Sequence, residues 1–242
     1  MTNRYILPAL VLLAALCFAL APFVTPPFTG FTADQLPVPQ IDPPVQPAGY
    51  AFAIWGLIYL GLVGSALFGL VARAGDEGWD AARGPLLVSL VLGIPWLAIA
   101  NASAIWATVV IVAMALTAIA ALWRTPERDL WTLRLPIGLY AGWLTAASWV
   151  SIGSTLAGYG IGPDQVGWAL IGVAGAGLVA LSVLWWGPRA PGYAFTAGWA
   201  LVGIMVKNGT ELPSVTLAAG VALVLICLVL ASRYLRPEMA TG

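Results

Sequence analysis

Long apolar runs separated by short polar stretches dominate the sequence. Most of these runs reach the roughly 20 residues that an α-helix needs to cross a lipid bilayer. The pattern predicts eight membrane-spanning helices, of which the seventh is the shortest and contains glycine. The runs lie at residues 5–24, 50–72, about 85–101, 104–123, 135–158, 166–186, 192–206 and 213–232.

The first run has two interpretations, a signal peptide or a retained membrane helix. Ala19-Leu20-Ala21 resembles a cleavage site, but Pro22 follows directly and disfavours cleavage. Leu16 also occupies the position before Cys17 where a lipoprotein signal needs a small residue. We therefore expect a retained helix.

Residues 25–48 form a loop rich in proline, which donates no backbone hydrogen bond and favours extended chain. The charged residues of this loop are Asp34 and Asp42, and its aromatic residues are Phe28 and Phe31. Two arrangements fit this composition. The loop either folds back as a lid over a pocket or forms an ordinary exposed connection.

Charge placement supports the eight-span arrangement and orients it. Of the 10 cationic residues, Lys207 alone falls on one side of such a bundle, and the arginines all fall on the other. The positive-inside rule then places both termini in the cytoplasm and loop 25–48 outside it. Without the seventh span, Arg233 and Arg236 would move to the outer side, so we keep this span. The arginines are Arg4, Arg73, Arg83, Arg124, Arg128, Arg134, Arg189, Arg233 and Arg236.

Composition agrees with a membrane protein and excludes several kinds of function. The chain is 61% hydrophobic and 8% charged, whereas soluble domains carry about 25% charged residues. The formal net charge is zero and no basic stripe is present, so we expect no nucleic-acid partner. We expect an all-α integral membrane protein whose partner is the lipid bilayer, in a bacterial inner membrane.

The available chemistry is also restricted. The sequence lacks histidine, which excludes haem ligation by His, Ser-His-Asp catalysis and the usual zinc sites. Cys17 and Cys227 lie inside apolar runs and are interpreted as core residues. No catalytic constellation can be assembled, so we expect no enzyme activity, no metal and no cofactor.

Polar residues within the spans are mainly hydroxyls and amides. No charge lies near the centre of any span, whereas ion pumps and proton-coupled transporters usually keep one there. The hydroxyls between Thr145 and Thr155 predict either hydrogen bonds between helices or the lining of a polar pocket. Lys207, Asn208 and Glu211 lie at a helix end, where they form an interfacial cluster or contact a ligand headgroup.

Glycine spacing predicts close helix packing. Gly138 and Gly142 form a GxxxG motif. Gly172, Gly175 and Gly177 leave one side of the sixth span without bulky side chains, so another helix can approach it closely. The spacing does not distinguish a partner in the same chain from a second copy, so a homodimer stays open. A four-residue echo, GYAF at 49–52 and again at 192–195, fits either an inverted repeat or chance.

The stretch 43–62, PPVQPAGYAFAIWGLIYLGL, leads from the loop into an aromatic helix without a charge. Trp55 and Tyr59 are four residues apart and therefore lie on one helical face. One interpretation is an aromatic belt with ordinary packing. The other is the wall of a pocket for a flat apolar ligand.

The pattern Pro47-x-x-Tyr50-x-Phe52-x-x-Trp55-x-x-x-Tyr59 resembles the start of the second helix in the tryptophan-rich sensory protein (TspO, translocator protein) family. Trp96 is similar to the tryptophan of that family's third helix. The segment Leu135-Pro136-x-x-x-Tyr140-x-x-Trp143 resembles its fifth helix, with Tyr140 where the family has tryptophan. The resemblance covers about residues 5–158, so we expect a TspO-like five-helix domain at 1–158 and three additional helices at 159–242.

This resemblance implies a receptor or sensor that binds a porphyrin, a sterol or a related planar apolar molecule. The implied pocket lies between the second, third and fifth helices. The alternative is a small facilitative transporter of an apolar or neutral solute. The candidate ligand-binding residues are Trp55, Tyr59, Trp96, Tyr140, Trp143, Tyr50 and Phe52.

Overall fold

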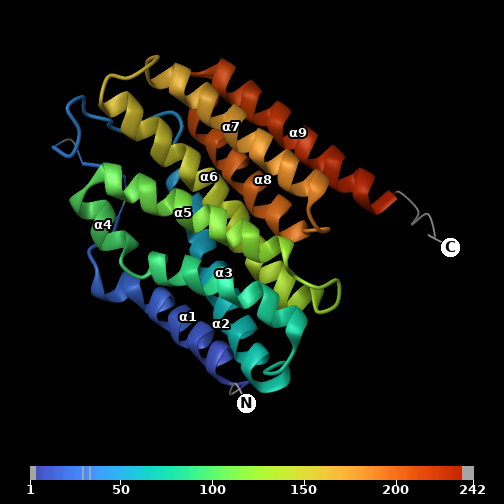
Figure 1. Ribbon diagram of the computed structural model, residues 1–242. Helices are drawn as coiled ribbons and strands as arrows, with labels where there is room; N and C mark the ends of the chain where they lie inside the picture. Colours follow the sequence, from blue (N-terminus) through green and yellow to red (C-terminus); the bar gives the residue numbers. More distant parts are fainter. Residues whose placement is uncertain (1–3, 29, 33, 236–242) are drawn as a thin grey trace.

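The computed structural model describes residues 4–28, 30–32 and 34–235, which form helices and loops without strands. The first half contains α1 (Ile6–Val24), the 3₁₀ turn η1 (Gly49–Ala53), α2 (Ile54–Ala72), α3 (Glu77–Gly93), α4 (Trp96–Ala102) and α5 (Ala104–Trp123). The second half contains the π-helical turn η2 (Leu130–Arg134), α6 (Leu135–Gly158), α7 (Gln165–Trp186), α8 (Pro191–Asn208) and α9 (Pro213–Leu235) (Figure 1).

The predicted spans all correspond to helices, but not all of them are long and apolar enough to cross a membrane. In the described residues six helices are, namely α1, η1–α2, α5, η2–α6, α7 and α9. Helices α3 and α4 make up a seventh if they are counted as one span. Helix α8 covers the predicted run 192–206 but does not reach this apolar character, so an eighth crossing stays a prediction.

The third span differs from the single helix predicted at about 85–101. It starts at Glu77, where the carboxylate of Asp76 caps the helix by accepting hydrogen bonds from the amides of Gly78 and Trp79. It then bends by 41° between α3 and α4. The break falls at Pro95, which lacks the amide hydrogen that would continue the helix.

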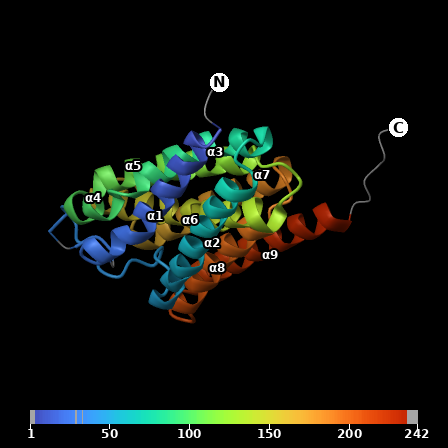
Figure 2. The same ribbon diagram turned by 90° about the horizontal axis from the view of Figure 1, so that it is seen from below.

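Helix α6 lies at the centre of the bundle. It packs against α5, α7, α8 and α2, while α1 packs on α2 and α3, and α9 packs on α7 and α8 (Figures 1 and 2). One cluster of buried apolar residues runs from α1 through α6 to α9. The segments 1–158 and 159–242, which were expected as a five-helix domain and three additional helices, therefore share one core. Helix α6 joins them.

Small residues allow α6 and α8 to approach closely within this chain. Gly138 lies against the backbone of Gly192 and Tyr193, and Gly142 lies against Tyr193 and Thr196. Further along the bundle, Gly175 of α7 accommodates the ring of Trp149. The GxxxG surface of α6 is thus covered by α8. The partner of Gly138 and Gly142 therefore lies in the same chain.

Hydroxyl groups of α6 bond to neighbouring helices, as one of the two sequence interpretations expects. Thr145 Oγ1 lies 2.8 Å from the hydroxyl of Tyr193, and Ser148 donates to the carbonyl of Ile111 at 3.3 Å. Ser151 Oγ lies 2.7 Å from Thr108 Oγ1. These bonds satisfy polar groups that would otherwise be costly inside the bundle.

The described arginines gather at the end of the bundle where α1 begins and α9 ends (Figure 1). Arg134 donates to the carbonyl of Pro126 at 2.7 Å, and Arg233 donates to the carbonyl of Gly187 at 2.8 Å. Lys207 lies at the opposite end, in the last turn of α8. Arg236 lies outside the described residues. Which end faces the cytoplasm stays a prediction.

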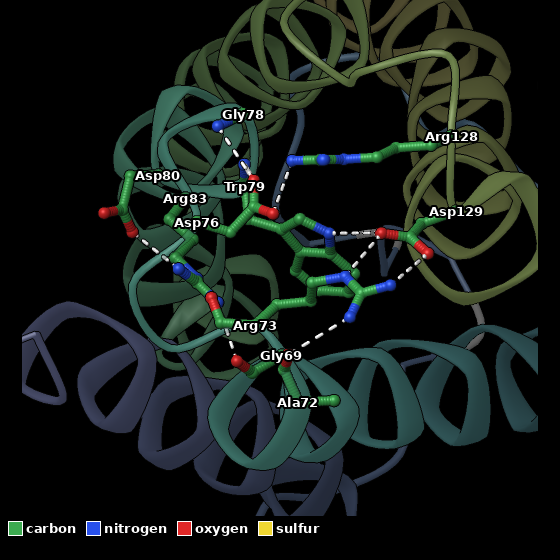
Figure 3. A network of polar contacts seen from close by, with 10 residues as sticks. All are labelled: Gly69, Ala72, Arg73, Asp76, Gly78, Trp79, Asp80, Arg83, Arg128 and Asp129. Atoms are coloured by element: carbon green, nitrogen blue, oxygen red, sulfur yellow. Dashed lines mark hydrogen bonds and ion pairs between the residues drawn. The ribbon is translucent and has the colours of Figure 1, made fainter.

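A network of ion pairs and hydrogen bonds centres on Asp129 at this arginine end (Figure 3). Arg73 donates to both carboxylate oxygens, from Nε at 2.9 Å and from Nη2 at 3.1 Å. The indole Nε1 of Trp79 donates to the same carboxylate at 2.9 Å. Beside it, Asp76 pairs with Arg128. The network joins the end of α2 to the start of α3 and to the turn before α6.

Arg83 closes the same network from inside (Figure 3). Its side chain is buried, and Nη2 donates to the carbonyls of Gly69 at 2.8 Å and Arg73 at 2.9 Å. These carbonyls belong to the C-terminal end of α2, where a cation is favourable. The ring of Trp79 lies directly against Gly69, where a Cβ atom would collide with it. The C-terminal end of α2 is therefore fixed in position.

The network lowers the pKa of Asp129. The side-chain hydrogen bond from Arg73 is the main cause, followed by the hydrogen bond from Trp79. A carboxyl group whose pKa is lower in the folded state stabilises the fold above its ordinary pKa of about 4. This contribution is lost as the pH falls from about 4 through the lowered pKa.

We expect Asp129→Asn to lower the midpoint of thermal unfolding in detergent by about 2–6 °C at pH 7, because the ionic bonds of Arg73 and Trp79 are weakened. The difference from wild type should narrow as the pH falls below about 4, because the carboxyl of the unfolded chain is then protonated and folding has to remove that proton. Glu77→Gln is the matched control, since Glu77 is exposed at the same end. Equal effects of the two changes at pH 7 would contradict the role given to Asp129.

We also expect Gly142→Ala to destabilise the protein by about 1–3 kcal/mol, because the new methyl group would collide with Tyr193 and Thr196 of α8. Gly64→Ala is the control, since nothing lies within 4 Å of a Cβ atom there. Thermal unfolding of both variants in the same detergent measures the difference. A Gly142→Ala variant as stable as Gly64→Ala would show that α6 and α8 are less closely packed.

Candidate functional site

A cavity of about 320 Å³ lies inside the half of the bundle away from the arginines. Its walls come from α1, α2, the α3–α4 bend, α5, α6 and α8, and loop 25–48 covers it. No charged residue belongs to the wall among the described residues. The aromatic residues of the wall are Phe18, Phe28, Phe31, Phe52, Trp55, Tyr59, Trp96 and Trp143.

The aromatic part of the wall is built around α2. Trp55 and Tyr59 follow each other by one turn, and their rings stack with centroids 5.3 Å apart and planes inclined by 22°. Phe18 of α1 meets both rings edge-on, at 5.9 Å and 5.2 Å. Trp143 of α6 meets Trp55 edge-on at 6.3 Å. Edge-on and offset-stacked arrangements are the favourable ones for aromatic pairs, so these rings hold one another in place.

Trp96 forms a second aromatic group near the bend of the third span. Its indole Nε1 donates to the carbonyl of Ala107 at 3.0 Å, which fixes the ring against α5. Phe28 of the loop meets this ring edge-on at 5.4 Å and in turn contacts Phe31 at 5.5 Å. The loop therefore contributes aromatic surface to the same cavity.

Two of the seven candidate residues lie off the cavity wall. Tyr140 is completely buried, where it packs edge-on against Phe18 at 5.7 Å and accepts a hydrogen bond from Ser89 Oγ at 3.0 Å. It supports the wall from behind. Tyr50 is 45% exposed and contacts Trp199 at 5.5 Å outside the cavity. The structure brings the other five together, namely Phe52, Trp55, Tyr59, Trp96 and Trp143.

Loop 25–48 takes the lid arrangement of the two expected from its sequence. The amide of Val38 donates to the carbonyl of Gly158 at 2.8 Å, and the amide of Ala48 donates to the carbonyl of Gly203 at 3.0 Å. Gln35 Nε2 donates to the carbonyl of Ala100 at 2.8 Å. The loop is thus attached to the ends of α6 and α4 and to α8.

The polar residues at the end of α8 hold the loop. Asn208 is buried and its Nδ2 donates to the carbonyl of Pro44 at 2.9 Å. Lys207 pairs with Asp42, whose side chain is exposed. Trp199 also donates from Nε1 to the carbonyl of Ala51 at 2.9 Å, and Ile204 lies on the cavity wall. Helix α8 therefore completes the cavity together with the first six helices.

Comparison with known families assigns the chain to one of them. The sequence model of the family described as TSPO-like protein matches residues 6–232. The chain belongs to the TSPO-like protein family. With its apolar helices, this membership makes it an integral, multi-pass membrane protein. A comparison with curated proteins and one with solved structures each gave no match.

The family match extends through α9, beyond the five helices in which the sequence motifs were found. In this TSPO-like protein α8 and the loop bring residues to the cavity that the motifs did not identify. The sequence did not single out Phe18, because it lies in a mainly aliphatic run without an aromatic partner at helical spacing. Ala200 and Ile204 are ordinary core residues by type, and only the packing of α8 places them on the wall.

We expect Asn208→Ala to loosen the loop. Loss of the buried bond to Pro44 should raise the hydrogen exchange of amides in residues 35–48 by about 5-fold. Lys207→Ala is the matched control, because an ion pair to an exposed carboxylate contributes little and should change exchange less than about 2-fold. Equal protection in the Asn208→Ala variant and in wild type would contradict this attachment.

Proposed function

We propose that this TSPO-like protein is a membrane receptor that binds a planar apolar ligand of the porphyrin or sterol type in the aromatic cavity. The observation that carries the proposal is the uncharged cavity of about 320 Å³ walled by Phe18, Trp55, Tyr59 and Trp143. Family membership supports a ligand-binding or sensing role for a membrane protein of this kind.

The chemistry of the wall favours a flat ring system. Aromatic side chains provide a large contact area with few rotatable bonds, so they lose little conformational entropy when a ligand is bound. Trp55 and Tyr59 are held by their own contacts with Phe18 and Trp143, so the wall is preorganised. The volume is at the lower end of the range of roughly 300–1,000 Å³ that is usual for ligand pockets.

The loop supports a sensing role for the same site. A ligand in the cavity would contact Phe28 and Phe31 of the loop as well as the walls of α2 and α6. Binding would therefore stabilise the covered arrangement of the loop, which is the part of the protein at the membrane surface. With the arginine end in the cytoplasm, the cavity opens in the outer half of a bacterial inner membrane.

Two planar probes test this proposal, protoporphyrin IX and the smaller hydrocarbon pyrene. At least one of them should quench tryptophan fluorescence saturably, beyond its effect on empty detergent micelles. Trp55→Ala combined with Tyr59→Ala should weaken binding about 10- to 100-fold, because two stacking faces are removed.

The matched control combines Trp106→Ala with Tyr50→Ala, which removes the same residue types from exposed positions outside the cavity. This control should bind like wild type. If both double variants lose binding equally, or if neither does, the aromatic cavity is not the binding site.

A further inference from the structure

Ser154 on the cavity wall has hydrogen-bonding capacity that no described residue uses. It lies on α6 and is only 5% exposed, and its hydroxyl forms no hydrogen bond with the described part of the chain. Ser151 lies on the same wall but is already bonded, with its hydroxyl 2.7 Å from Thr108 Oγ1. The two serines are therefore not equivalent, and Ser154 is the one available to a ligand.

Gln40 of the loop also has hydrogen-bonding capacity that no described residue uses. It is also 5% exposed and lies on the wall, and its Nε2 donates to the carbonyls of Val38 at 3.2 Å and Pro39 at 3.4 Å. Because both neighbours are acceptors, the amide nitrogen must face them, which leaves Oε1 as the free end. Oε1 is buried and has no partner among the described residues. Buried acceptors without a partner are rare, so this one calls for an explanation.

Both groups lie at the loop end of the cavity. The bond from the amide of Val38 to the carbonyl of Gly158 places the chain next to Gln40 at the end of α6. Ser154 precedes Gly158 by one helical turn and lies on the same face. Trp143 lies roughly 16 Å further along α6, given the rise of about 1.5 Å per residue. The cavity thus has a polar end, where Gln40 and Ser154 accompany the loop rings Phe28 and Phe31, and an apolar deep end.

The polar end carries no charge to match an ionised ligand. No Arg, Lys, Asp or Glu belongs to the described cavity wall. An ionised carboxylate would therefore lose its hydration without gaining a charged partner. A hydroxyl group fits better, because it carries no charge and can both accept a hydrogen bond from Ser154 and donate one to an acceptor such as Gln40 Oε1. Oε1 is covered in this arrangement, and a turn about the broad terminal torsion of glutamine would expose it to such a group while weakening the long bonds from Nε2 to Val38 and Pro39.

We propose that Ser154 and Gln40 form a subsite for an uncharged hydroxyl or N–H group of the ligand. The cavity would then select planar ring compounds with one neutral polar end over the bare hydrocarbon and over the ionised carboxylate. This inference rests on the proposed function, since it describes how the same cavity distinguishes among flat ligands.

Three probes that share one ring system test the subsite on the full chain in detergent: pyrene, 1-pyrenemethanol and 1-pyrenecarboxylate. After correction for partition into empty micelles, wild type should bind pyrenemethanol about 5- to 10-fold more tightly than pyrene. The carboxylate should bind more weakly than pyrenemethanol. Ser154→Ala and Gln40→Met should each reduce the preference for the alcohol to about 2-fold or less, where the preference is the ratio of the two affinities measured on the same variant.

Ser148→Ala is the matched control, because Ser148 is equally buried on α6 but bonds to Ile111 and lies off the wall. It should keep the full preference. Ser154→Cys is the second variant if Ser154→Ala fails to fold, since a thiol is a much weaker hydrogen-bonding group.

A wild type that binds pyrene and pyrenemethanol equally, or variants that keep the full preference, would overturn the subsite and leave the proposed function standing. A tighter affinity for the carboxylate than for the alcohol would also overturn it. If no probe binds in a way that depends on Trp55 and Tyr59, the proposed function fails, and the subsite fails with it.

Discussion

The close packing of α6 against its neighbours is the constraint on which the rest of the structure depends. A membrane-spanning bundle gains little from burying apolar side chains, because lipid is equally apolar, so helices associate through close contact and internal hydrogen bonds. Gly138 and Gly142 allow α8 to approach the backbone of α6, and Thr145 bonds to Tyr193 across that contact. The opposite side of α6 bonds through hydroxyls to α5. Because α6 is fixed on both sides, Trp143 can form one wall of an open space without the bundle closing over it.

The second wall is held at both of its ends by different kinds of interaction. At the arginine end, Asp129, Trp79 and Arg83 fix the last turn of α2. At the loop end, η1 is attached to α8, where Trp199 donates to the carbonyl of Ala51. Trp55 and Tyr59 lie between these two attachments. Charged groups are concentrated where water can solvate them, and α2 carries no charged residue from Ile54 to Ala72, which is the distribution that a bilayer imposes.

The sequence predicted the helices well because their signal is local. The runs at 104–123 and 135–158 coincide with α5 and α6, since the change from apolar to polar residues marks both ends of each helix. The bend at Pro95 was present in the sequence but overlooked, because an apolar run continues across it. The early start of α3 at Glu77 was missed for the opposite reason, since a capped polar turn carries no apolar signal.

The candidate site was only partly predictable, because residue type does not tell which face of a helix borders a cavity. Trp55, Tyr59 and Trp143 follow from spacing and family resemblance, and they lie on the wall. Tyr140 has the same spacing signal but is buried behind the wall, where it contacts Phe18 and bonds to Ser89. Phe18 and Ile204 reach the wall only through the packing of α1 and α8. Such contacts between distant segments have no signature in one sequence.

Aromatic rings line the cavity at both ends, and Gln40 and Ser154 add hydrogen-bonding groups at its loop end. This arrangement determines how a receptor of this kind would discriminate among ligands. Stacking on aromatic faces is strong but tolerant, because flat rings of many kinds can occupy it. Hydrogen bonds to buried partners discriminate more sharply, since a ligand that lacks the matching group leaves them unsatisfied. Here the polar end is formed partly by Gln40 of the loop that covers the cavity. The loop that would be stabilised by a bound ligand would therefore also help to distinguish one ligand from another. Recognition and response would be coupled in this loop.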